Sequence, residues 1–444
     1  MAKTLGIIRE TKSKWEGRIP LVPEDFQPLL AQGINILAQP SSVRAFADEE
    51  LRAAGAVIGE DLSSADVIFG VKEIKPERFL PGKTYLFFSH VIKGQAYNMP
   101  MLKRMMELGC NLLDYEVITD SKGRRLIAFG RFAGIAAMVD TLWAFGRRLT
   151  AQSIASPFAR LKKLVDYPAK PADAEQERFP KLALIKREFA HLAQDIRANG
   201  LPAAIVPMVV GITGYGSASG GVQEMLDILP VETIPAGDLE GFMANGRFSA
   251  HKIYKVVFKE ADMVVPRQGN FDLQDYYHNP QRYQGVMYRY LPHLKVLMNC
   301  IYWTKDYPRV LTMESARKLY EANPDNPLTI GDVSCDLRGA IEPTVQTTEP
   351  DNPVYVYDLK QKTARFGFDG HGPLILAVDF LPSEMPCDAS GYFSHILRDF
   401  VPDILSADFS KPVDATGLPD HLHRALILHQ GKLTAPFTYI EKYL

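Results

Sequence analysis

The stretch VVGITGYGSASGGVQEM, residues 209–225, joins an apolar run of strand length to a helical pattern through a turn rich in glycine. Glycine allows a backbone to approach a phosphate closely, and the N-terminus of a helix offers N–H donors and a favourable dipole. The stretch therefore predicts a site for a nucleotide pyrophosphate, with a tight strand-to-helix turn as the alternative interpretation. The residues predicted to bind the nucleotide here are Gly214, Tyr215, Gly216 and Ser217.

The glycine pattern is irregular, and it does not identify the cofactor. Ser219 occupies the position of the usual third glycine. The next strand, VETIP at 231–235, shows neither a terminal carboxylate nor an arginine pair; Glu232 precedes Thr233, and Asp238 lies in the loop beyond. The sequence therefore predicts NAD or NADP without choosing between them.

On both sides of this turn, short apolar runs alternate with helical patterns. Examples of the apolar runs are LGIIRE at 5–10, INILAQ at 34–39, DVIFGV at 66–71 and RLIAFG at 125–130. We expect each of these runs to form a strand. Strands that alternate with helices predict a parallel sheet with crossover connections, which is the doubly wound α/β arrangement.

With 444 residues, the chain is too long for one ordinary core, so two domains are expected. A long helical pattern at 132–150 and another from Asp388 bracket the second series of strands. We predict two Rossmann-like doubly wound α/β domains, linked by long helices, with a cleft between them. Residues 1–138 plus 387–444 form the first domain and residues 139–386 the second. The polar segment 166–181 is expected to be a surface excursion.

Composition excludes several classes of function. Apolar residues make up 46% of the chain, charged residues 23%, and the net charge is −2, so neither nucleic acid nor an anionic membrane is an expected partner. The four cysteines are far apart in sequence and show no metal-ligand spacing, so no metal is expected, and a reducing compartment fits. An apolar strand begins almost at once, which leaves no room for a leader; we expect a cytoplasmic protein.

Two neighbouring strands end on titratable side chains. DVIFGVKE reaches Lys72, and KTYLFFSH reaches His90. Surface strand ends often carry such residues, but ligands of open parallel sheets also bind at the carboxyl ends of strands. Lys72 and His90 are therefore candidates for acid–base catalysis beside a nicotinamide, across from the glycine turn.

Charged residues near these strand ends are candidate substrate ligands. Glu73 follows Lys72, and Glu116 ends the run LLDYE, so either carboxylate could tune the pair or lie solvated at the surface. Arg9 and Arg18 lie at and just after the end of the first strand, and a guanidinium binds a carboxylate through two hydrogen bonds. Arg9 and Arg18 are therefore candidates to hold the carboxylates of a substrate, or they are ordinary surface arginines.

Several motifs resemble the alanine dehydrogenase and pyridine nucleotide transhydrogenase superfamily. The N-terminal motifs are RETKSKWEGRIPLVPE, GVKE, FFSHVIKGQ, DYE and AFGRFAG. Within the superfamily the chain looks most like lysine–2-oxoglutarate reductase, the lysine-consuming module of aminoadipic semialdehyde synthase, and like lysine-forming saccharopine dehydrogenases. NCIYWTKDYPRVLT, GDVSCDLRGAIE and VDFLPSEMPCDAS continue that resemblance over nearly the whole chain.

The resemblance implies an oxidoreductase of lysine metabolism. An imine of lysine and 2-oxoglutarate would be reduced to saccharopine by NAD(P)H, or the reverse, with Lys72 and His90 as the acid–base pair. It also implies that the first domain binds the substrates, with Arg18 and Lys93 near their carboxylates, and that Asp332, or Asp336, lies near the nicotinamide. A separate glutamate-forming saccharopine dehydrogenase would then be a partner.

Two alternatives stay open at this stage. The chain could be an alanine-dehydrogenase-like enzyme that aminates a keto acid with ammonia, because that group also uses a lysine and a histidine. It could instead be a catalytically silent nucleotide-binding regulator. A requirement for free lysine in NAD(P)H oxidation separates the first alternative from the saccharopine-type enzyme.

Overall fold

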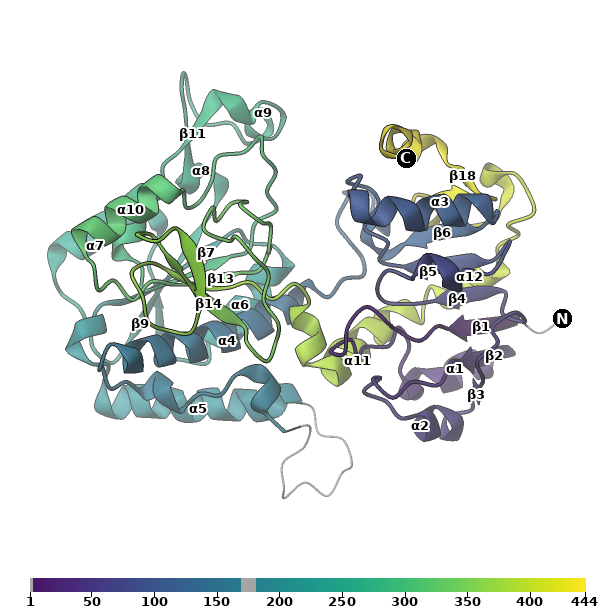
Figure 1. The fold of residues 1–444 in the computed structure, drawn as a ribbon, viewed down its shortest axis with the longest axis horizontal. Coiled ribbons are helices and arrows are strands. Elements are labelled where there is room, and N and C mark those ends of the chain that lie inside the picture. The colour runs from purple at the N-terminus through teal and green to yellow at the C-terminus, as the bar shows by residue number, and fades with distance from the viewer. Residues whose placement is uncertain (1–2, 169–180) are drawn as a thin grey trace. The chain divides into compact units, whose positions relative to one another are not determined.

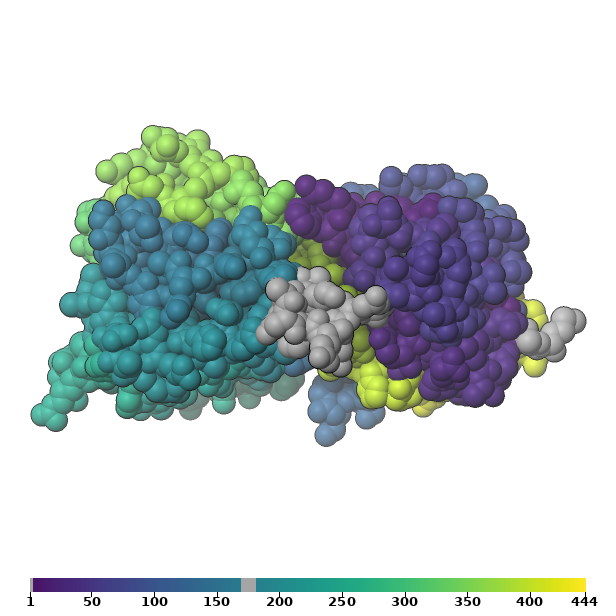
Figure 2. Space-filling model, turned by 90° about the horizontal axis from the view of Figure 1, so that it is seen from below, coloured from purple at the N-terminus to yellow at the C-terminus, as the bar shows by residue number. Residues whose placement is uncertain are grey.

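The computed structural model describes residues 3–168 and 181–444, so most of the polar segment predicted as a surface excursion lies outside the described residues. The chain divides into two compact units, Met1–Phe129 with Pro386–Leu444, and Gly130–Met385. Figure 2 shows the first residues, in purple, and the last, in yellow, within the same body. Residues 130–138, which the sequence analysis assigned to the first domain, belong to the second unit because helix α4 (Gly130–Ala151) packs on α6 (Ser217–Leu226).

The first unit is built on an eight-stranded sheet with the order β18-β17-β6-β5-β4-β1-β2-β3 (Figure 1). Its strands are β1 Lys3–Ile7, β2 Ile34–Ala38, β3 Val57–Ile58, β4 Val67–Phe69, β5 Thr84–Phe87, β6 Asn111–Asp114, β17 Leu426–His429 and β18 Lys432–Leu433. Its α-helices are α1 Phe26–Leu30, α2 Asp48–Ala53, α3 Met99–Glu107, α11 Pro386–Leu397, α12 Val401–Ser406 and α13 Asp420–His423. Strands β1 to β6 run parallel, in the doubly wound arrangement that the sequence predicted.

The strand order of this sheet reverses between β1 and β4. The chain builds outward from β1 to β3 on one side and from β4 to β6 on the other. Ligands of such sheets bind where the order reverses, at the carboxyl ends of the strands. The residues after β1 and β4 therefore lie at the point of the unit best placed to bind a ligand.

The segment RLIAFG, predicted as a strand, contains no strand and only one isolated bridge, between Thr119 and Arg125. The reason is that β6 already has another neighbour. Strand β17, from the C-terminal part of the chain, pairs antiparallel with β6 and takes that place in the sheet.

The second unit contains another eight-stranded sheet, with the order β15-β14-β16-β13-β12-β7-β9-β8, and a separate pair, β10-β11. The strands are β7 Met208–Thr213, β8 Val231–Thr233, β9 Ile253–Phe258, β10 Val264–Pro266, β11 Tyr283–Gly285, β12 Val296–Asn299, β13 Thr329–Asp332, β14 Val354–Asp358, β15 Thr363–Phe366 and β16 Leu374–Leu376. Besides α4 and α6, its α-helices are α5 Lys181–Asn199, α7 Leu239–Asn245, α8 Glu260–Met263, α9 Leu273–His278 and α10 Met313–Ala322. The sheet is mixed, since β14 pairs antiparallel with both β15 and β16.

Two glycines bring α4 and α6 into close contact. A Cβ atom on Gly134 would lie 1.9 Å from the carbonyl oxygen of Ala218, and one on Gly221 would lie 2.0 Å from that of Arg131. No side chain fits at either position. Part of the glycine pattern that begins at residue 211 thus serves helix packing, while the rest lies in the turn itself.

Candidate active site

Four strands of the first unit end at the same edge of the sheet, and charged residues gather there. The carboxyl ends of β1, β4, β5 and β6 are followed or formed by Glu10, Lys72 with Glu73, Ser89 with His90, and Asp114. Lys72 and His90, predicted as neighbours from their strand-end positions, are in fact carried by adjacent strands, because β4 pairs directly with β5.

Glu73 links the cations of this group. Its carboxylate lies 2.8 Å from Nδ1 of His90 and 2.8 Å from Nζ of Lys12, and only 10% of its side chain is exposed. Burial opposes ionisation of Glu73, but the positive charges of His90, Lys72 and Lys12 hold its pKa well below the usual range. Glu73 is therefore a permanent anion that fixes the orientation of the imidazole.

The backbone at His90 is strained, and a hydrogen bond to the preceding residue, Ser89, holds it in place. His90 has a φ of 51°, a left-handed conformation that is uncommon for residues other than glycine. The buried Asp114 carboxylate accepts hydrogen bonds from the backbone N–H and the hydroxyl of Ser89, directly before His90. Burial raises the pKa of Asp114 to about 6. Asp114 therefore anchors the turn that presents the histidine.

Glu10 plays the same part for the lysine. Its carboxylate accepts hydrogen bonds from the backbone N–H groups of Val71, at 2.6 Å, and Lys72, at 3.0 Å. Burial, with repulsion from Glu16, raises the pKa of Glu10 to about 8. Because β1 and β4 are neighbours at the point where the strand order reverses, Glu10, after β1, can bind the backbone at Lys72, after β4.

Arg18 is buried in an ion pair. Its guanidinium donates to both carboxylate oxygens of Glu16, at 2.7 and 2.5 Å, and only 3% of Arg18 is exposed. It also lies over the ring of Phe129, 4.4 Å from the centroid. Burial opposes ionisation of Glu16, but Arg18 and Lys72 hold its pKa below the usual value. The two-point geometry expected for a substrate carboxylate is here formed with Glu16.

The other predicted substrate ligands differ in their surroundings. Arg9 donates to the carbonyl of Pro40 and pairs with Glu60, both away from the Lys72 group. Glu116 pairs with Arg125 at 2.5 Å. Lys93 is exposed in the loop after His90. Among the five predicted ligands, Glu73 makes a hydrogen bond with a predicted catalytic residue, His90.

Sequence reasoning missed four charged residues of this site: Glu10, Lys12, Glu16 and Asp114. Three of them lie in RETKSKWEGR, within the very stretch that supplied Arg9 and Arg18. The sequence feature that could have identified these residues is the high density of charged residues directly after the first apolar strand. What it could not show was the strand order that places this loop beside β4.

In the second unit, the glycine turn has the geometry that a pyrophosphate requires. Gly214 follows β7 with a φ of 82°, and the helix α6 starts at Ser217 with Gly216 at its N-cap. A Cβ atom on Gly216 would meet nothing within 4 Å. The backbone therefore borders open space at the N-terminus of a ten-residue helix, and these residues fit a nucleotide phosphate.

Asp332, predicted near the nicotinamide, is fully buried. One of its carboxylate oxygens accepts from Thr344, at 2.6 Å, and the other from Asn299, at 2.9 Å, and Ser334, at 2.8 Å. Asn299 in turn accepts from Thr213 at 2.9 Å. This network ties together the carboxyl ends of β7, β12 and β13, and Asp332 acts by positioning them.

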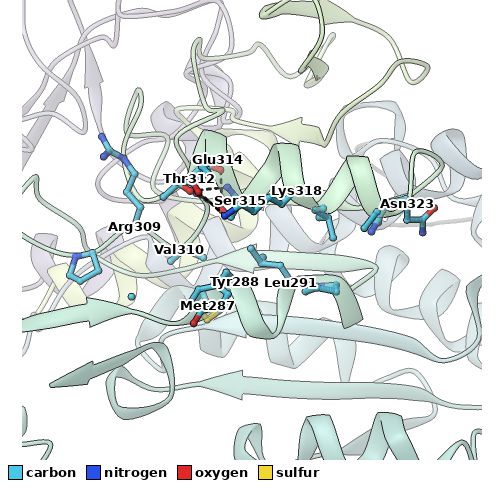
Figure 3. Close-up of a pocket in the computed structure, with 16 residues that line it drawn as sticks. Met287, Tyr288, Leu291, Arg309, Val310, Thr312, Glu314, Ser315, Lys318 and Asn323 are labelled. Carbon is cyan, nitrogen blue, oxygen red and sulfur yellow. Dashed lines mark hydrogen bonds and ion pairs between the residues drawn. The ribbon is translucent and has the colours of Figure 1, made fainter. Parts of the chain in front are cut away.

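A cavity of about 650 Å³ lies along α10, away from the predicted residues (Figure 3). Met287, Tyr288 and Leu291 form one side, and Ser315 and Lys318 of α10 form the other. None of the residues that line it belongs to the glycine turn or to the Asp332 network. The residues that line this cavity are therefore distinct from the predicted site residues.

Within residues 3–168 and 181–444, no cluster of three or more His, Cys, Asp or Glu side chains is arranged to hold a metal ion. The helices in the described part of the chain include none that is long and apolar enough to cross a membrane.

Part of the first unit matches a known protein family. Residues 6–136, which carry Lys72 and His90, match the family model for the alanine dehydrogenase/PNT N-terminal domain. The chain is similar in sequence to aminoadipic semialdehyde synthases and to lysine-forming saccharopine dehydrogenases.

The curated relatives differ in how much of their length is matched. Alpha-aminoadipic semialdehyde synthase of Arabidopsis thaliana is 34% identical over 99% of this chain, and the mitochondrial protein of that name in Mus musculus is 31% identical over 99%. The chain spans only 41% and 47% of those two proteins. Saccharopine dehydrogenase [NAD(+), L-lysine-forming] of Neurospora crassa is 27% identical over 91% of this chain and is matched over 92% of its own length.

Solved structures show the same fold. An L-alanine dehydrogenase superposes with a TM-score of 0.62 at 14% identity, covering 99% of this chain and 98% of its own. A transhydrogenase from Sinorhizobium meliloti superposes with a TM-score of 0.51 at 13% identity, covering 97% and 99%. Both confirm the predicted α/β fold with two domains, in which the sheets are mixed and mainly parallel.

Proposed function

We propose that this chain is an NAD(P)-dependent oxidoreductase that interconverts saccharopine with lysine and 2-oxoglutarate. The observation that carries the proposal is the Lys72, Glu73 and His90 group at the carboxyl ends of β4 and β5, in a chain similar in sequence to saccharopine dehydrogenases. In the reductive direction, a hydride adds to the carbon of the lysine–2-oxoglutarate imine, and the nitrogen ends as an amine.

His90 and Lys72 would move the protons of this reaction. Nδ1 of His90 is held by Glu73, which leaves Nε2 as the ring nitrogen that exchanges a proton with a substrate. Loss of water on imine formation, or attack of water in the reverse direction, requires a general acid and a general base in turn. Two titratable groups on adjacent strands supply both roles.

The substrates carry several carboxylates, and the cations of the first unit would bind them. We assign this role to Lys93, in the loop after His90, and to Arg9 and Arg18. Since Arg18 is paired with Glu16, it would contact a carboxylate only by sharing its guanidinium. Glu73 and Glu116 would face the amine of lysine.

The second unit would hold the coenzyme, NAD or NADP, which supplies or accepts the hydride. Its pyrophosphate would lie against the backbone of Gly214, Tyr215, Gly216 and Ser217, and the turn borders open space at Gly216. Asp332 would act through Asn299 and Thr213 by keeping the ends of three strands in place.

Coenzyme oxidation in the presence of 2-oxoglutarate tests the proposal. Each of NADH and NADPH is mixed with 2-oxoglutarate and one amine at a time, including lysine, ornithine and ammonia, and the loss of reduced coenzyme is followed by absorbance. The proposal expects oxidation that depends on lysine and yields saccharopine. Oxidation with ammonia alone would instead show an alanine-dehydrogenase-like enzyme, and binding without oxidation would show a silent regulator.

If saccharopine is the product, a separate glutamate-forming saccharopine dehydrogenase is the partner that would consume it.

The cytoplasmic location stays a prediction from the sequence.

A further inference from the structure

The strand beside the glycine turn is not the one that the sequence order suggests. In the second sheet, β7 pairs with β9, and β8, which follows α6 in the chain, lies at the edge beyond β9. Thr213 at the end of β7 is in register with Phe258 at the end of β9, and the N–H of Gly214 donates to the Phe258 carbonyl at 2.9 Å. Whatever follows Phe258 therefore lies next to the turn.

An acidic residue, Glu260, occupies this position. Its carboxylate accepts a hydrogen bond from the hydroxyl of Tyr277 at 2.7 Å and a longer one from the hydroxyl of Tyr215 at 3.4 Å. Tyr215 belongs to the glycine turn itself, between Gly214 and Gly216. Glu260 is thus held near the predicted pyrophosphate site by the backbone hydrogen bond between Gly214 and Phe258 and by its own contact with Tyr215.

A hollow of about 450 Å³ adjoins Glu260. Tyr277 contacts the Glu260 carboxylate and also lines the hollow. The other lining residues are His278, Pro280, Gln281, Lys305, Asp306 and Tyr307. They come from the end of α9 and the turn before β11, and from the segment after β12, which is one of the two neighbours of β7. Nucleotides bind doubly wound sheets at such a place, across the carboxyl ends of the central strands.

We propose that the Glu260 carboxylate binds the hydroxyl groups of the adenosine ribose and that the chain therefore selects NAD over NADP. This inference rests on the proposed coenzyme site at the glycine turn. A carboxylate accepts hydrogen bonds from the two ribose hydroxyls, whereas a 2′-phosphate in the same place brings a second negative charge against it. Lys305 lines the hollow too, and a 2′-phosphate bound by Lys305 is the competing arrangement.

Direct binding measurements on the whole chain test this inference. NADH and NADPH are titrated separately, and the fluorescence of the reduced nicotinamide reports binding. We expect NADH to bind the unaltered protein at least about tenfold more tightly, as a single like-charge contact near a surface implies. Glu260→Gln keeps a hydrogen-bond acceptor for Tyr277 but removes the charge. We therefore expect NADPH to bind more tightly, so that the ratio of the NADPH to the NADH dissociation constant falls by about tenfold.

A matched control removes the same charge from the neighbouring strand. Glu232 lies on β8, the strand that follows α6, and pairs with Lys252. Glu232→Gln should leave the NADH to NADPH ratio unchanged. Displacement of NADH by 5′-AMP and by 2′,5′-ADP should show the same preference, since these two compounds contain only the adenosine end.

The outcomes separate this inference from the proposed function. Equal binding of both coenzymes, tighter binding of NADPH, or an unchanged ratio in Glu260→Gln would overturn the role of Glu260. A protein that prefers NADPH and still oxidises it in the presence of lysine and 2-oxoglutarate would keep the proposed function and lose this inference. Absence of binding by either coenzyme would overturn both.

Discussion

Carboxylates accept hydrogen bonds from the backbone at Lys72 and directly before His90. Glu10 holds the backbone at Lys72, and Asp114 holds the backbone directly before His90. Such support is typical of residues whose position matters for chemistry. It explains why two residues from different strands keep one arrangement.

Loss of either residue should therefore affect turnover and spare the fold. We expect Lys72→Met and His90→Gln each to lower kcat by about 10²–10⁴-fold, the usual contribution of a general acid or base, with coenzyme affinity and melting temperature nearly unchanged. Lys75→Met is the matched control, because Lys75 is exposed three residues further along. Near-normal turnover in the Lys72→Met, His90→Gln double variant would end the assignment.

Arg18 should show a stability effect that Lys72 does not. Arg18→Ala leaves the Glu16 carboxylate, only 2% exposed, without its partner, and breaking such a buried pair costs about 3–5 kcal/mol. Arg18→Lys should also raise KM for 2-oxoglutarate, because an ammonium cannot form two parallel hydrogen bonds.

Chemical denaturation and steady-state kinetics measure the two effects of Arg18 separately. A double variant, Arg18→Met with Glu16→Leu, should recover much of the stability without recovering KM. Unchanged KM in a folded Arg18 variant would limit the residue to a structural role.

The raised pKa of Glu10 predicts a pH dependence of stability. Between its ordinary pKa near 4.5 and about 8, the folded protein keeps a proton on Glu10 that the unfolded chain has released, so stability falls as pH rises through this window. Because Glu10 is partly exposed, we expect a loss of about 1–2 kcal/mol from this group.

Denaturation of Glu10→Gln from pH 5 to pH 8 measures this contribution. The variant loses one acceptor for the Val71 and Lys72 N–H groups, so its stability starts lower, but its decline with pH should be shallower. Glu60→Gln is the control, because Glu60 is exposed and pairs with Arg9. If the free energy of unfolding of Glu10→Gln fell with pH as steeply as that of the unaltered protein, a group other than Glu10 would cause the pH dependence.

The sequence predicted Lys72 and His90 because residues at strand ends can be recognised from apolar runs. It could not predict the roles of Glu10, Glu16 and Asp114. Their burial depends on which strands are neighbours, and a carboxylate after a strand is as often solvated. The same limit applied to Asp332, which was predicted beside the nicotinamide and lies in a fully buried network.

At the scale of elements, we expect the glycines around α6 to have two separate functions, coenzyme binding and helix packing. Gly216→Val adds a side chain where the structure has open space, so it should keep the melting temperature and weaken NAD(P)H binding by at least about tenfold, which corresponds to 1.4 kcal/mol. Gly221→Val places its Cβ against the carbonyl of Arg131 in α4, so it should lower the melting temperature instead.

Thermal melts and direct coenzyme titration below the melting transition compare these two variants. Strong coenzyme binding by folded Gly216→Val would mean that the coenzyme lies elsewhere. Equal loss of stability in both variants would mean that the turn is structural.

The element pattern also shows where sequence reasoning ended. The parallel strands β1, β2, β4 and β5 overlap predicted apolar runs, because each is a short run before a helical pattern or a loop, whereas RLIAFG was wrongly predicted as a strand. The antiparallel strands β14, β15, β17 and β18 at the sheet edges were not predicted as such, because orientation depends on a partner far away in the chain. The sequence also did not predict that β8 lies at the edge and that β9 is the neighbour of β7. Glu260, which follows β9, was therefore not predicted as a coenzyme ligand.

At the scale of the whole molecule, the first unit is completed by the last 59 residues of the chain, Pro386–Leu444. Asp25 accepts hydrogen bonds from Ser394 at 2.6 Å and Arg398 at 2.7 Å, and β17 pairs with β6. Phe437 and Ile440 lie in the same apolar core as Val91, directly after His90. The predicted catalytic residues thus depend on a segment more than 300 residues away in sequence.

The two units should accordingly behave differently when they are expressed as separate chains. Residues 130–385 contain all eight strands of their sheet and the glycine turn, so we expect this fragment to unfold cooperatively and to bind NAD(P)H. Residues 1–129 alone expose the β6 edge and the core under β17, so we expect no cooperative melt by circular dichroism. Residues 1–129 joined to 386–444 by a flexible linker should regain one. A cooperative melt of residues 1–129 alone, at the temperature of the linked form, would show that the C-terminal segment only covers the unit, and that the position of His90 does not depend on it.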